Sequence, residues 1–496
     1  MRVRIPPPTL FNLLMKISNF LKYSDLIFLS FLSFFTRFWH LHLPPKVVFD
    51  EAHFGLYATK YFSHQYYFDI HPPLGKMLFA LAGLFSKIKP GFDFQAGSFY
   101  NDFNYLSLRF LPALFGSLFI ILVYFFVKEL GFSRRTAFLS SFLLLLNNAL
   151  VVQSRFILMD IILLFFIILS LYLYLLSKKQ YPFSFWWYFL NITNSLSLGM
   201  TISIKWTGFG ALAIIWFLTI FQDKIFSLKK ENLIKIFLIF FFPLFIYFLI
   251  FSLHFYLLPY SCNKNCGAVI DNYLTNSPPN SQSDSYNFPP KGSLFKKFFL
   301  LNKLMLAGNF SSAMFFPYQS DWFEWPFMIR PILYFEEPNN EKTSYIYFLG
   351  NPFAWWLAFG GLLFYLYLIA RNYFYRFKMN LPENFYSESF HLLLVSFLIF
   401  FIPFASIKRF MLLYHYLPAL TFSTIIFAAV FDGIISLKYK VDFSDKIFFD
   451  NKKADLIFLI ILLIIALSFL FFSPLTYGFP LTEKEFQWRM WLSSWN

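Results

Sequence analysis

The chain of 496 residues has little charge and almost no cysteine. Only 14% of its residues are charged and 58% are hydrophobic, whereas soluble domains average about 25% charged residues. This shortage of charge excludes an ordinary soluble domain. The two cysteines, Cys262 and Cys266 in SCNKNCG, are too few for a disulfide scaffold and lack the four ligands of a structural zinc site. Whether these two cysteines pair stays open.

Several motifs of nucleotide and metal chemistry are also absent. The sequence contains no P-loop, no GxGxxG, no HExxH and no metal-ligand spacing. We therefore expect no cofactor and no catalytic metal. The net charge of +15 does not indicate a nucleic-acid partner, because the basic residues lie in short segments between apolar runs. Basic residues in such segments orient a membrane protein.

The apolar residues gather in runs of about 20, long enough to cross a bilayer core of about 30 Å as a helix. They predict an all-α polytopic membrane protein that is anchored among membrane lipids. We expect about eleven spans: 24–43, 105–127, 136–153, 156–177, 186–203, 206–222, 233–258, 350–370, 388–407, 410–435 and 454–473. HPPLGKMLFALAGLFSKI and FFPYQSDWFEWPFMIRPILYF predict amphipathic helices in the outer loops.

The basic residues place the N-terminus in the cytoplasm and two long loops on the outer side. These loops are 44–104 and 259–349. We therefore divide the chain into an N-terminal transmembrane catalytic module, 1–258, an outer polar loop, 259–349, and a C-terminal transmembrane module, 350–496.

Acidic residues stand at this outer face. Asp50 and Glu51 follow the first span directly, in a stretch that continues to DIHPP with Asp69 and His71. A carboxylate beside a bilayer is partly desolvated, which raises its affinity for a proton and suits a general base. The prolines of DIHPP restrict the backbone and hold Asp69 and His71 in place. The alternative is a solvated pair of loop acids.

Cations are expected at the same depth. Arg109 lies a few residues into an apolar span, and its guanidinium suits a phosphate group, although a purely structural arginine is the alternative. Lys205 separates two spans, where it either binds phosphate or caps a helix. Arg155 and Asp160 either belong to the site or form an ion pair that orders a helical hairpin.

Further basic residues come on the outer side in SIKRFMLLYHYLPAL, namely Lys408, Arg409 and His415, and a buried structural histidine is an alternative for His415. Together, acids and cations at one face suit transfer from a lipid-linked phosphate donor. The cations hold and stabilise the leaving phosphate, and the carboxylate deprotonates an incoming hydroxyl. A lipid or solute transporter is the non-enzymatic alternative, but its ionisable groups belong near the bilayer midplane.

The motif DEAHFGLYATKYFSHQYYFDIHPPLGKMLFALAG resembles the first luminal loop of the protein O-mannosyltransferases, which are membrane glycosyltransferases of the GT-C fold class. Further matching motifs follow in the order of that family: NYLSLRFLPALFG, QSRFILMDIILLFF, GMTISIKWTGFG, WFEWPFMIRPILYF, YFLGNPFAWW and RFMLLYHYLPALTF. The resemblance covers about residues 50–420.

The resemblance implies transfer of mannose from a polyprenyl phosphate mannose donor to Ser or Thr hydroxyls of translocated proteins. It implies Asp50 as catalytic base, Glu51 as its acidic neighbour, and Arg109 and Lys205 as contacts of the donor phosphate. It also implies inversion at the anomeric carbon, so that one base suffices. Another GT-C enzyme, acting on lipid A or a cell-wall polymer, is the alternative.

One departure from the family concerns the loop 259–349, which is too short for the β-trefoil MIR domain of the eukaryotic members. Bacterial members also lack this domain. The resemblance therefore implies a bacterial plasma membrane, an undecaprenyl-type carrier and a site that faces the periplasm or exterior. Trp322, Trp325 and Arg330 in this loop are candidates for a place near the acceptor.

Overall fold

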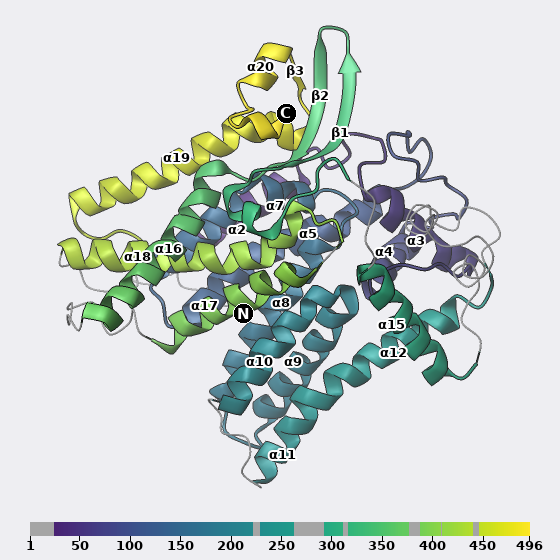
Figure 1. Cartoon of the computed structure of the whole chain (residues 1–496), viewed down its shortest axis with the longest axis horizontal. Helices are drawn as coiled ribbons and strands as arrows, with labels where there is room; N and C mark the ends of the chain where they lie inside the picture. Colours follow the sequence, from purple (N-terminus) through teal and green to yellow (C-terminus); the bar gives the residue numbers. More distant parts are fainter. Residues whose placement is uncertain are drawn as a thin grey trace, which may run out of the picture.

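A computed structural model describes residues 24–221, 229–261, 292–310, 316–375, 387–407, 409–439 and 446–496. Cys262, Cys266 and Lys408 lie outside these residues. In the described part, long helices pack into a bundle, and a β-hairpin rises from one end of it, away from α11 (Figure 1).

The first half of the chain supplies a series of long and short helices. They are α2 (Ser24–Phe38), α3 (Glu51–Ser63), α4 (Leu74–Phe85), α5 (Leu106–Glu129), α6 (Arg134–Leu145), α7 (Asn148–Gln153), α8 (Asp160–Lys178), α9 (Phe185–Ile204), the 3-10 turn η1 (Trp206–Gly208), α10 (Phe209–Phe221), α11 (Lys230–Ile236), the π-helical turn η2 (Phe237–Phe241) and α12 (Phe242–Leu257). Helix α5 packs between α2 and α8, and α9 packs between α8 and α12. The short helices α3 and α4 pack against each other beside this group.

The second half adds another helical group. Its elements are α15 (Leu294–Phe310), η3 (Trp322–Phe327), β1 (Ile332–Asn339), β2 (Lys342–Phe348), α16 (Pro352–Tyr375), α17 (Glu388–Phe401), η5 (Ile402–Ser406), η6 (Leu413–Tyr416), α18 (Leu417–Tyr439), α19 (Lys452–Tyr477), β3 (Pro480–Leu481), α20 (Glu483–Gln487) and η7 (Ser493–Trp495). Helix α18 packs against α16, α17 and α6, and so joins the two halves. The buried apolar side chains of both halves form one core.

Capping residues explain where several helices begin and end. The Ser184 hydroxyl accepts a hydrogen bond from the backbone of Trp187 at the start of α9. Asn451 does the same for two backbone N–H groups of α19, which otherwise lack partners. Helix α19 ends at Gly478, which has a positive φ of 75° that glycine adopts without steric cost.

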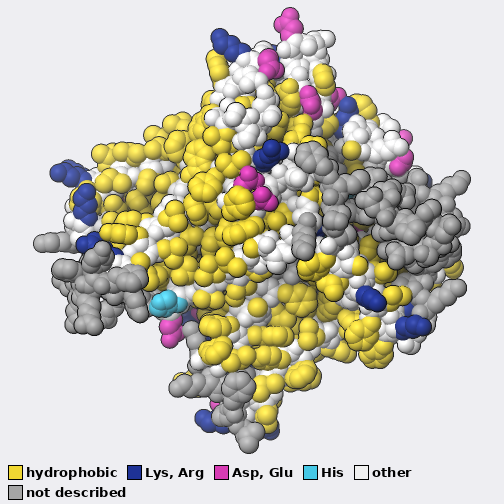
Figure 2. Space-filling view, viewed as in Figure 1, with side chains coloured by type: hydrophobic (Ala, Val, Ile, Leu, Met, Phe, Trp, Pro, Cys, Tyr) yellow, Lys and Arg dark blue, Asp and Glu magenta, His cyan; other side chains and the backbone are white. Residues whose placement is uncertain are grey.

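Seven helices among the described residues are long and apolar enough to cross a membrane, so the prediction of about eleven spans is corrected to seven on this criterion. They are Leu106–Glu129, Asp160–Lys178, Lys230–Leu257, Pro352–Arg371, Glu388–Ser406, Leu413–Tyr439 and Lys452–Tyr477. Figure 2 shows hydrophobic side chains over most of the visible helical surface, with charged side chains on the hairpin and at outlying helix ends. Both observations agree with a multi-pass membrane protein.

The other four expected spans take different forms. The described part of the first is α2, of 15 residues. The run 136–153 divides into α6 and α7 because Asn147 between them has an extended backbone. Helix α9 has 20 residues, but NITNS makes it less apolar, and η1 with α10 forms only a shorter apolar helix over Trp206–Phe221.

The prediction of an all-α protein is wrong at the hairpin. Strands β1 and β2 pair antiparallel, and β3 pairs with β2 to give the order β1-β2-β3. Aromatic and β-branched residues in ILYF and TSYIYF favour strands, and Asn340 supplies a positive φ of 54° in the turn. The amphipathic helix expected over this region is only the short η3. After the first loop the expected helix is present as α4, and its place in the membrane interface stays a prediction.

Candidate functional site

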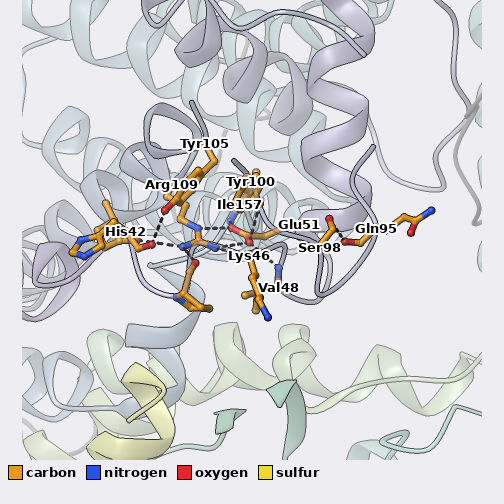
Figure 3. Close-up of polar contacts among 12 residues, drawn as sticks. His42, Lys46, Val48, Glu51, Gln95, Ser98, Tyr100, Tyr105, Arg109 and Ile157 are labelled. Carbon is orange, nitrogen blue, oxygen red and sulfur yellow. Dashed lines mark hydrogen bonds and ion pairs between the residues drawn. The ribbon is translucent and has the colours of Figure 1, made fainter. Parts of the chain in front are cut away.

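The loop that follows α2 is built around the Glu51 carboxylate (Figure 3). Glu51 begins α3, and its side chain is completely buried. Its two oxygens accept hydrogen bonds from the backbone N–H groups of Val48 (2.9 Å) and Ile157 (3.0 Å), from the Tyr100 hydroxyl (3.1 Å) and twice from Arg109 (both 2.8 Å). Glu51 is therefore a structural centre of the loop, with its hydrogen-bonding capacity used internally.

Arg109 completes this network from the first turns of α5, where it is also completely buried. Besides Glu51, its guanidinium donates to the carbonyl oxygens of Leu41 (3.4 Å), Pro44 (2.9 Å) and Lys46 (2.9 Å). A guanidinium has five N–H donors, and these contacts engage all of them. In this structure the Arg109 donors are all used within the protein, and the expected contact of Arg109 with a donor phosphate stays a prediction.

Asp50 differs from its neighbour in both contacts and exposure. It is only partly buried at the N-cap of α3, and no hydrogen bond from the described residues reaches its carboxylate. Burial raises the pKa of Asp50, and the nearby Asp160 and Asp69 raise it further, while His53 and Lys205 lower it. A carboxylate with a raised pKa and unused lone pairs has the properties of a general base.

An ion pair between Asp160 and Lys205 stands beside Asp50. Lys205 Nζ lies 2.8 Å and 2.9 Å from the two carboxylate oxygens of Asp160 and 5.1 Å from the centroid of the Tyr414 ring. Asp160 begins α8, and Lys205 connects α9 to η1. The suggested ion pair between Arg155 and Asp160 is therefore wrong, because Lys205 is the partner of Asp160.

Arg155 instead holds the end of α2. Its guanidinium donates to the carbonyl oxygens of Arg37, Trp39 and His40. A cation at this place offsets the negative end of the helix dipole. Burial lowers the pKa of Arg155 to about 10. Its hydrogen bonds to the end of α2 are structural, so the structure does not bring this predicted residue into contact with Asp50 or Lys205.

Asp69 and His71 lie on a short loop that Lys76 holds from α4. Lys76 Nζ donates to Asp69 (2.6 Å) and to the carbonyl oxygens of His71 (2.8 Å) and Pro72 (2.6 Å). All three ammonium hydrogens therefore fix the loop. Burial, and then the charges of Lys205 and other nearby cations, lower the pKa of His71 well below its ordinary value. His71 is thus a neutral imidazole that faces a cationic region.

The C-terminal half supplies Arg409 and His415 to the same region. The Arg409 guanidinium lies 3.4 Å from His415 Nε2, and Arg409 Nε is buried without a partner among the described residues. The His415 ring bonds to the backbone of Leu412 and stacks between Tyr414 (4.6 Å) and Trp325 (5.9 Å between centroids). Arg409 therefore retains a donor for an anion, and the contact of Trp325 with this cluster is its ring stack on His415.

Two other predicted residues are not brought together with these groups. Trp322 packs edge-on against Phe401 at 5.0 Å, and Arg330 is exposed and donates to the carbonyl oxygen of Pro317 (3.1 Å). In the described part of the chain, neither residue hydrogen-bonds to or stacks on Asp50, Lys205 or Arg409.

Sequence reasoning missed three functional neighbours. Tyr100 and Lys76 hold the loops that carry Glu51 and Asp69, and Tyr334 on β1 lies near Asp50 and Asp160, whose charges raise its pKa further after burial. Tyr334 is in FMIRPILYF, which reads as an amphipathic helix. Only recognition of the strand pattern in that segment could have drawn attention to it.

This geometry leaves the Asp50 carboxylate without a hydrogen bond from the described residues and near the Lys205 cation. Asp50 can take a proton from a hydroxyl, while Lys205 and Arg409 offset negative charge on a leaving group. Within the described ranges, no three His, Cys, Asp or Glu side chains are placed to hold a metal ion.

Solved structures share this arrangement of helices. The Saccharomyces cerevisiae protein O-mannosyltransferase Pmt1-Pmt2 complex, bound to the sugar donor, matches with a TM-score of 0.81 at 20% identity, over 96% of this chain and 92% of that one. The Archaeoglobus fulgidus oligosaccharyltransferase AglB, in complex with an inhibitory peptide and a dolichol-phosphate, matches with a TM-score of 0.53 at 15% identity, over 96% and 58%. The molecule is thus a mostly helical membrane protein with a GT-C-like fold.

Sequence comparison defines the family. The model of dolichyl-phosphate-mannose-protein mannosyltransferase matches residues 27–259, and that of the C-terminal four-transmembrane region of protein-O-mannosyltransferase matches residues 294–495. The chain belongs to the protein O-mannosyltransferase family. It is 35% identical over 247 residues to dolichyl-phosphate-mannose–protein mannosyltransferase 3 of Saccharomyces cerevisiae, which covers 47% of this chain and 32% of that relative. The chain spans about a third or less of the length of the first curated relatives that it matches.

Proposed function

We propose that the protein transfers mannose from a polyprenyl-phosphate carrier to a Ser or Thr hydroxyl of a polypeptide. The observation that carries this proposal is the contrast between neighbouring carboxylates. Glu51 accepts five hydrogen bonds within the protein, whereas Asp50 accepts none from the described residues and lies near Lys205. The family relationship supplies the sugar and the acceptor class.

Asp50 is the base of the proposed reaction. Its carboxylate takes the proton of the acceptor hydroxyl, the hydroxyl oxygen forms a bond to the anomeric carbon of mannose, and the bond from that carbon to the phosphate oxygen breaks. The electron pair of the broken bond leaves with the polyprenyl phosphate. A single displacement inverts the anomeric configuration, and one base is enough for it.

Lys205 and Arg409 are the proposed contacts of the donor phosphate. Asp160 holds the Lys205 ammonium, and Arg409 has a buried Nε–H without a partner among the described residues. Charge-assisted hydrogen bonds from such groups become stronger as the phosphate gains charge in the transition state. The neutral His71, which faces both cations, contributes a polar group without adding a third charge.

Arg109 serves this reaction indirectly. It holds Glu51 and three carbonyl oxygens of the first loop, and Glu51 begins the helix whose N-cap is Asp50. Arg109 is therefore a positioning residue in our proposal, and Glu51 transmits its effect.

The proposal extends to the kind of lipid carrier, the membrane in which the protein resides and its orientation there. We propose an undecaprenyl-type carrier in a bacterial plasma membrane, with the site at the periplasmic or outer face and the N-terminus in the cytoplasm. The motivation is the short interval 258–293 between α12 and α15, because a separate domain typically needs about 50 residues or more. A member without a MIR domain there handles its acceptor with the rest of the 259–349 segment.

Purified full-length protein in lipid nanodiscs tests the proposal. Dolichyl-phosphate-mannose and undecaprenyl-phosphate-mannose, each with labelled sugar, are supplied with a Ser/Thr peptide or with lipid A. Transfer to the peptide, lost in Asp50→Asn, is the expected result, and NMR of the glycopeptide reports whether the anomeric configuration is inverted. Transfer to lipid A alone would favour the other GT-C activity, and full turnover by Asp50→Asn would remove Asp50 as the base.

A further inference from the structure

Tyr334 stands at an irregularity of the hairpin. In the pairing of β1 with β2, Leu333 is opposite Tyr347 and Phe335 is opposite Ile346, so Tyr334 has no partner across the ladder. An extra residue of this kind is a β-bulge, which turns a side chain away from the direction that a regular strand would give it. The Tyr334 ring is buried, with 5% of its surface exposed.

The ring of Tyr334 packs flat against Phe49 of the first loop. The two centroids are 4.1 Å apart and the planes are inclined by only 8°. Phe49 has a φ of +47°, in the left-handed region that residues other than glycine rarely adopt. An unfavourable backbone conformation persists only where surrounding contacts hold it, and the stack with Tyr334 is such a contact.

The position of Phe49 gives this contact its importance. Phe49 directly precedes Asp50, so its backbone angles set the direction in which Asp50 and Glu51, at the start of α3, leave the preceding loop. In this conformation, Glu51 reaches Arg109 and Tyr100 in the protein interior, while the Asp50 carboxylate stays free of bonds to the described residues. A different angle at Phe49 would turn the base away from the acceptor.

The hydroxyl end of Tyr334 is held by a residue of α7. Gln153 Nε2 donates a hydrogen bond of 2.8 Å to the Tyr334 hydroxyl, and Gln153 is buried. The sheet holds Tyr334 from the other direction, since its neighbours Leu333 and Phe335 pair with β2. The ring is therefore a fixed support, and the first loop rests against it.

We propose that Tyr334 is a positioning residue, whose ring holds the strained Phe49 backbone and thereby points the Asp50 carboxylate at the acceptor hydroxyl. This inference rests on the proposed function, because it assigns Tyr334 a part in the same reaction. Tyr334 acts through its ring face and through Phe49. Its hydroxyl serves only to hold the ring on Gln153.

Three variants of the full-length protein in nanodiscs test this role. Tyr334→Leu removes the ring face, Tyr334→Phe keeps it, and Phe49→Leu removes the other half of the stack. The matched control is Tyr345→Leu, because Tyr345 is a partly buried tyrosine on β2 whose ring stacks on Phe486 at 4.3 Å, away from the first loop.

We expect Tyr334→Leu and Phe49→Leu to lower kcat about 10- to 100-fold with little change in either KM, since a displacement of about 1 Å has effects of that size. Tyr334→Phe and Tyr345→Leu should stay within about threefold of the wild type. Opening the contact also admits water to Asp50, so the acidic limb of the kcat profile should move to lower pH in Tyr334→Leu. A purely structural role would leave that limb unchanged.

Several outcomes would overturn the proposal. Equal losses in Tyr334→Phe and Tyr334→Leu would assign the effect to the hydroxyl, and a raised acceptor KM with unchanged kcat would make Tyr334 a binding residue. Wild-type kinetics in Phe49→Leu would remove the stack from the mechanism, even if Tyr334→Leu failed to fold. Inactive wild-type protein with every sugar donor would instead refute the proposed function, and so the two failures are distinguishable.

Discussion

Replacing Arg109 with alanine separates a structural arginine from a phosphate ligand. In the wild type, Arg109 makes two hydrogen bonds to Glu51 and three to backbone carbonyl oxygens, and both side chains are completely buried. The alanine variant would leave the buried Glu51 carboxylate without its cation, with only Val48, Ile157 and Tyr100 as donors. Breaking a buried pair by removing one partner costs about 3–5 kcal/mol of folding free energy.

The assay for this prediction is reversible unfolding in mixed micelles, combined with steady-state kinetics. Arg109→Ala should lose about 3–5 kcal/mol, and its kcat should fall with similar changes in donor and acceptor KM. Arg330→Ala is the matched control, because Arg330 is exposed and donates a hydrogen bond to the carbonyl oxygen of Pro317, so its loss should change stability by less than about 1 kcal/mol.

A double-mutant cycle completes the test. Glu51→Gln with Arg109→Met removes both charges and should cost much less than the sum of the single changes, because neither charge is left unpaired. Additive losses would contradict the pairing as the source of the cost. Wild-type stability of Arg109→Ala, together with a selective rise in donor KM, would refute the structural assignment and restore Arg109 as a phosphate contact.

Three other substitutions probe the site. Asp50→Asn should lower transfer by about 10²–10⁴-fold, the size of a lost general base. Burial raises the pKa of Asp50, so the free energy of unfolding of the wild type falls as pH rises through that pKa. Asp50→Asn should lack this fall and should be at least as stable as the wild type at neutral pH. Unfolding of the variant would contradict this reasoning. Asp160→Asn removes a charge that raises the same pKa, so the acidic limb of kcat should move to lower pH, and an upward shift would count against it. Arg409→Ala should raise the donor KM about 10-fold or more with little change in the acceptor KM, because a hydrogen bond to a charged group contributes about 1.5–3 kcal/mol. An unchanged donor KM would exclude Arg409 from phosphate binding.

Much of the architecture could be predicted from periodicity and composition. Long apolar runs locate α5, α8, α16, α18 and α19 within a few residues, because a helix in lipid needs about 20 apolar residues and satisfies its own backbone. The length of an apolar run did not predict the shorter helices and the strands. Extended backbone at Asn147 divides one run, and the strand residues around Tyr334 lie in a segment whose aromatic pattern also fits an amphipathic helix.

The candidate site was predictable in part. The motif order put Asp50, Asp69, Asp160 and Lys205 among the candidates, and the last three lie close enough to influence the pKa of Asp50. Partners were not predictable, because a charged side chain pairs with whatever the fold brings near it. Lys205 pairs with Asp160, for which the sequence had suggested Arg155 as one alternative partner, and Arg155 bonds to the end of α2.

The amino-acid sequence by itself thus determined that this is a membrane protein and that its ionisable groups gather in a few loops. It also determined the family to which the chain belongs. Each of these depends on side chains that are neighbours along the chain. Tertiary structure alone decided which carboxylate is enclosed and which stays unbonded. Glu51 and Asp50 are adjacent acids in sequence, and they differ because Arg109, Tyr100 and Ile157 converge on one of them from distant segments.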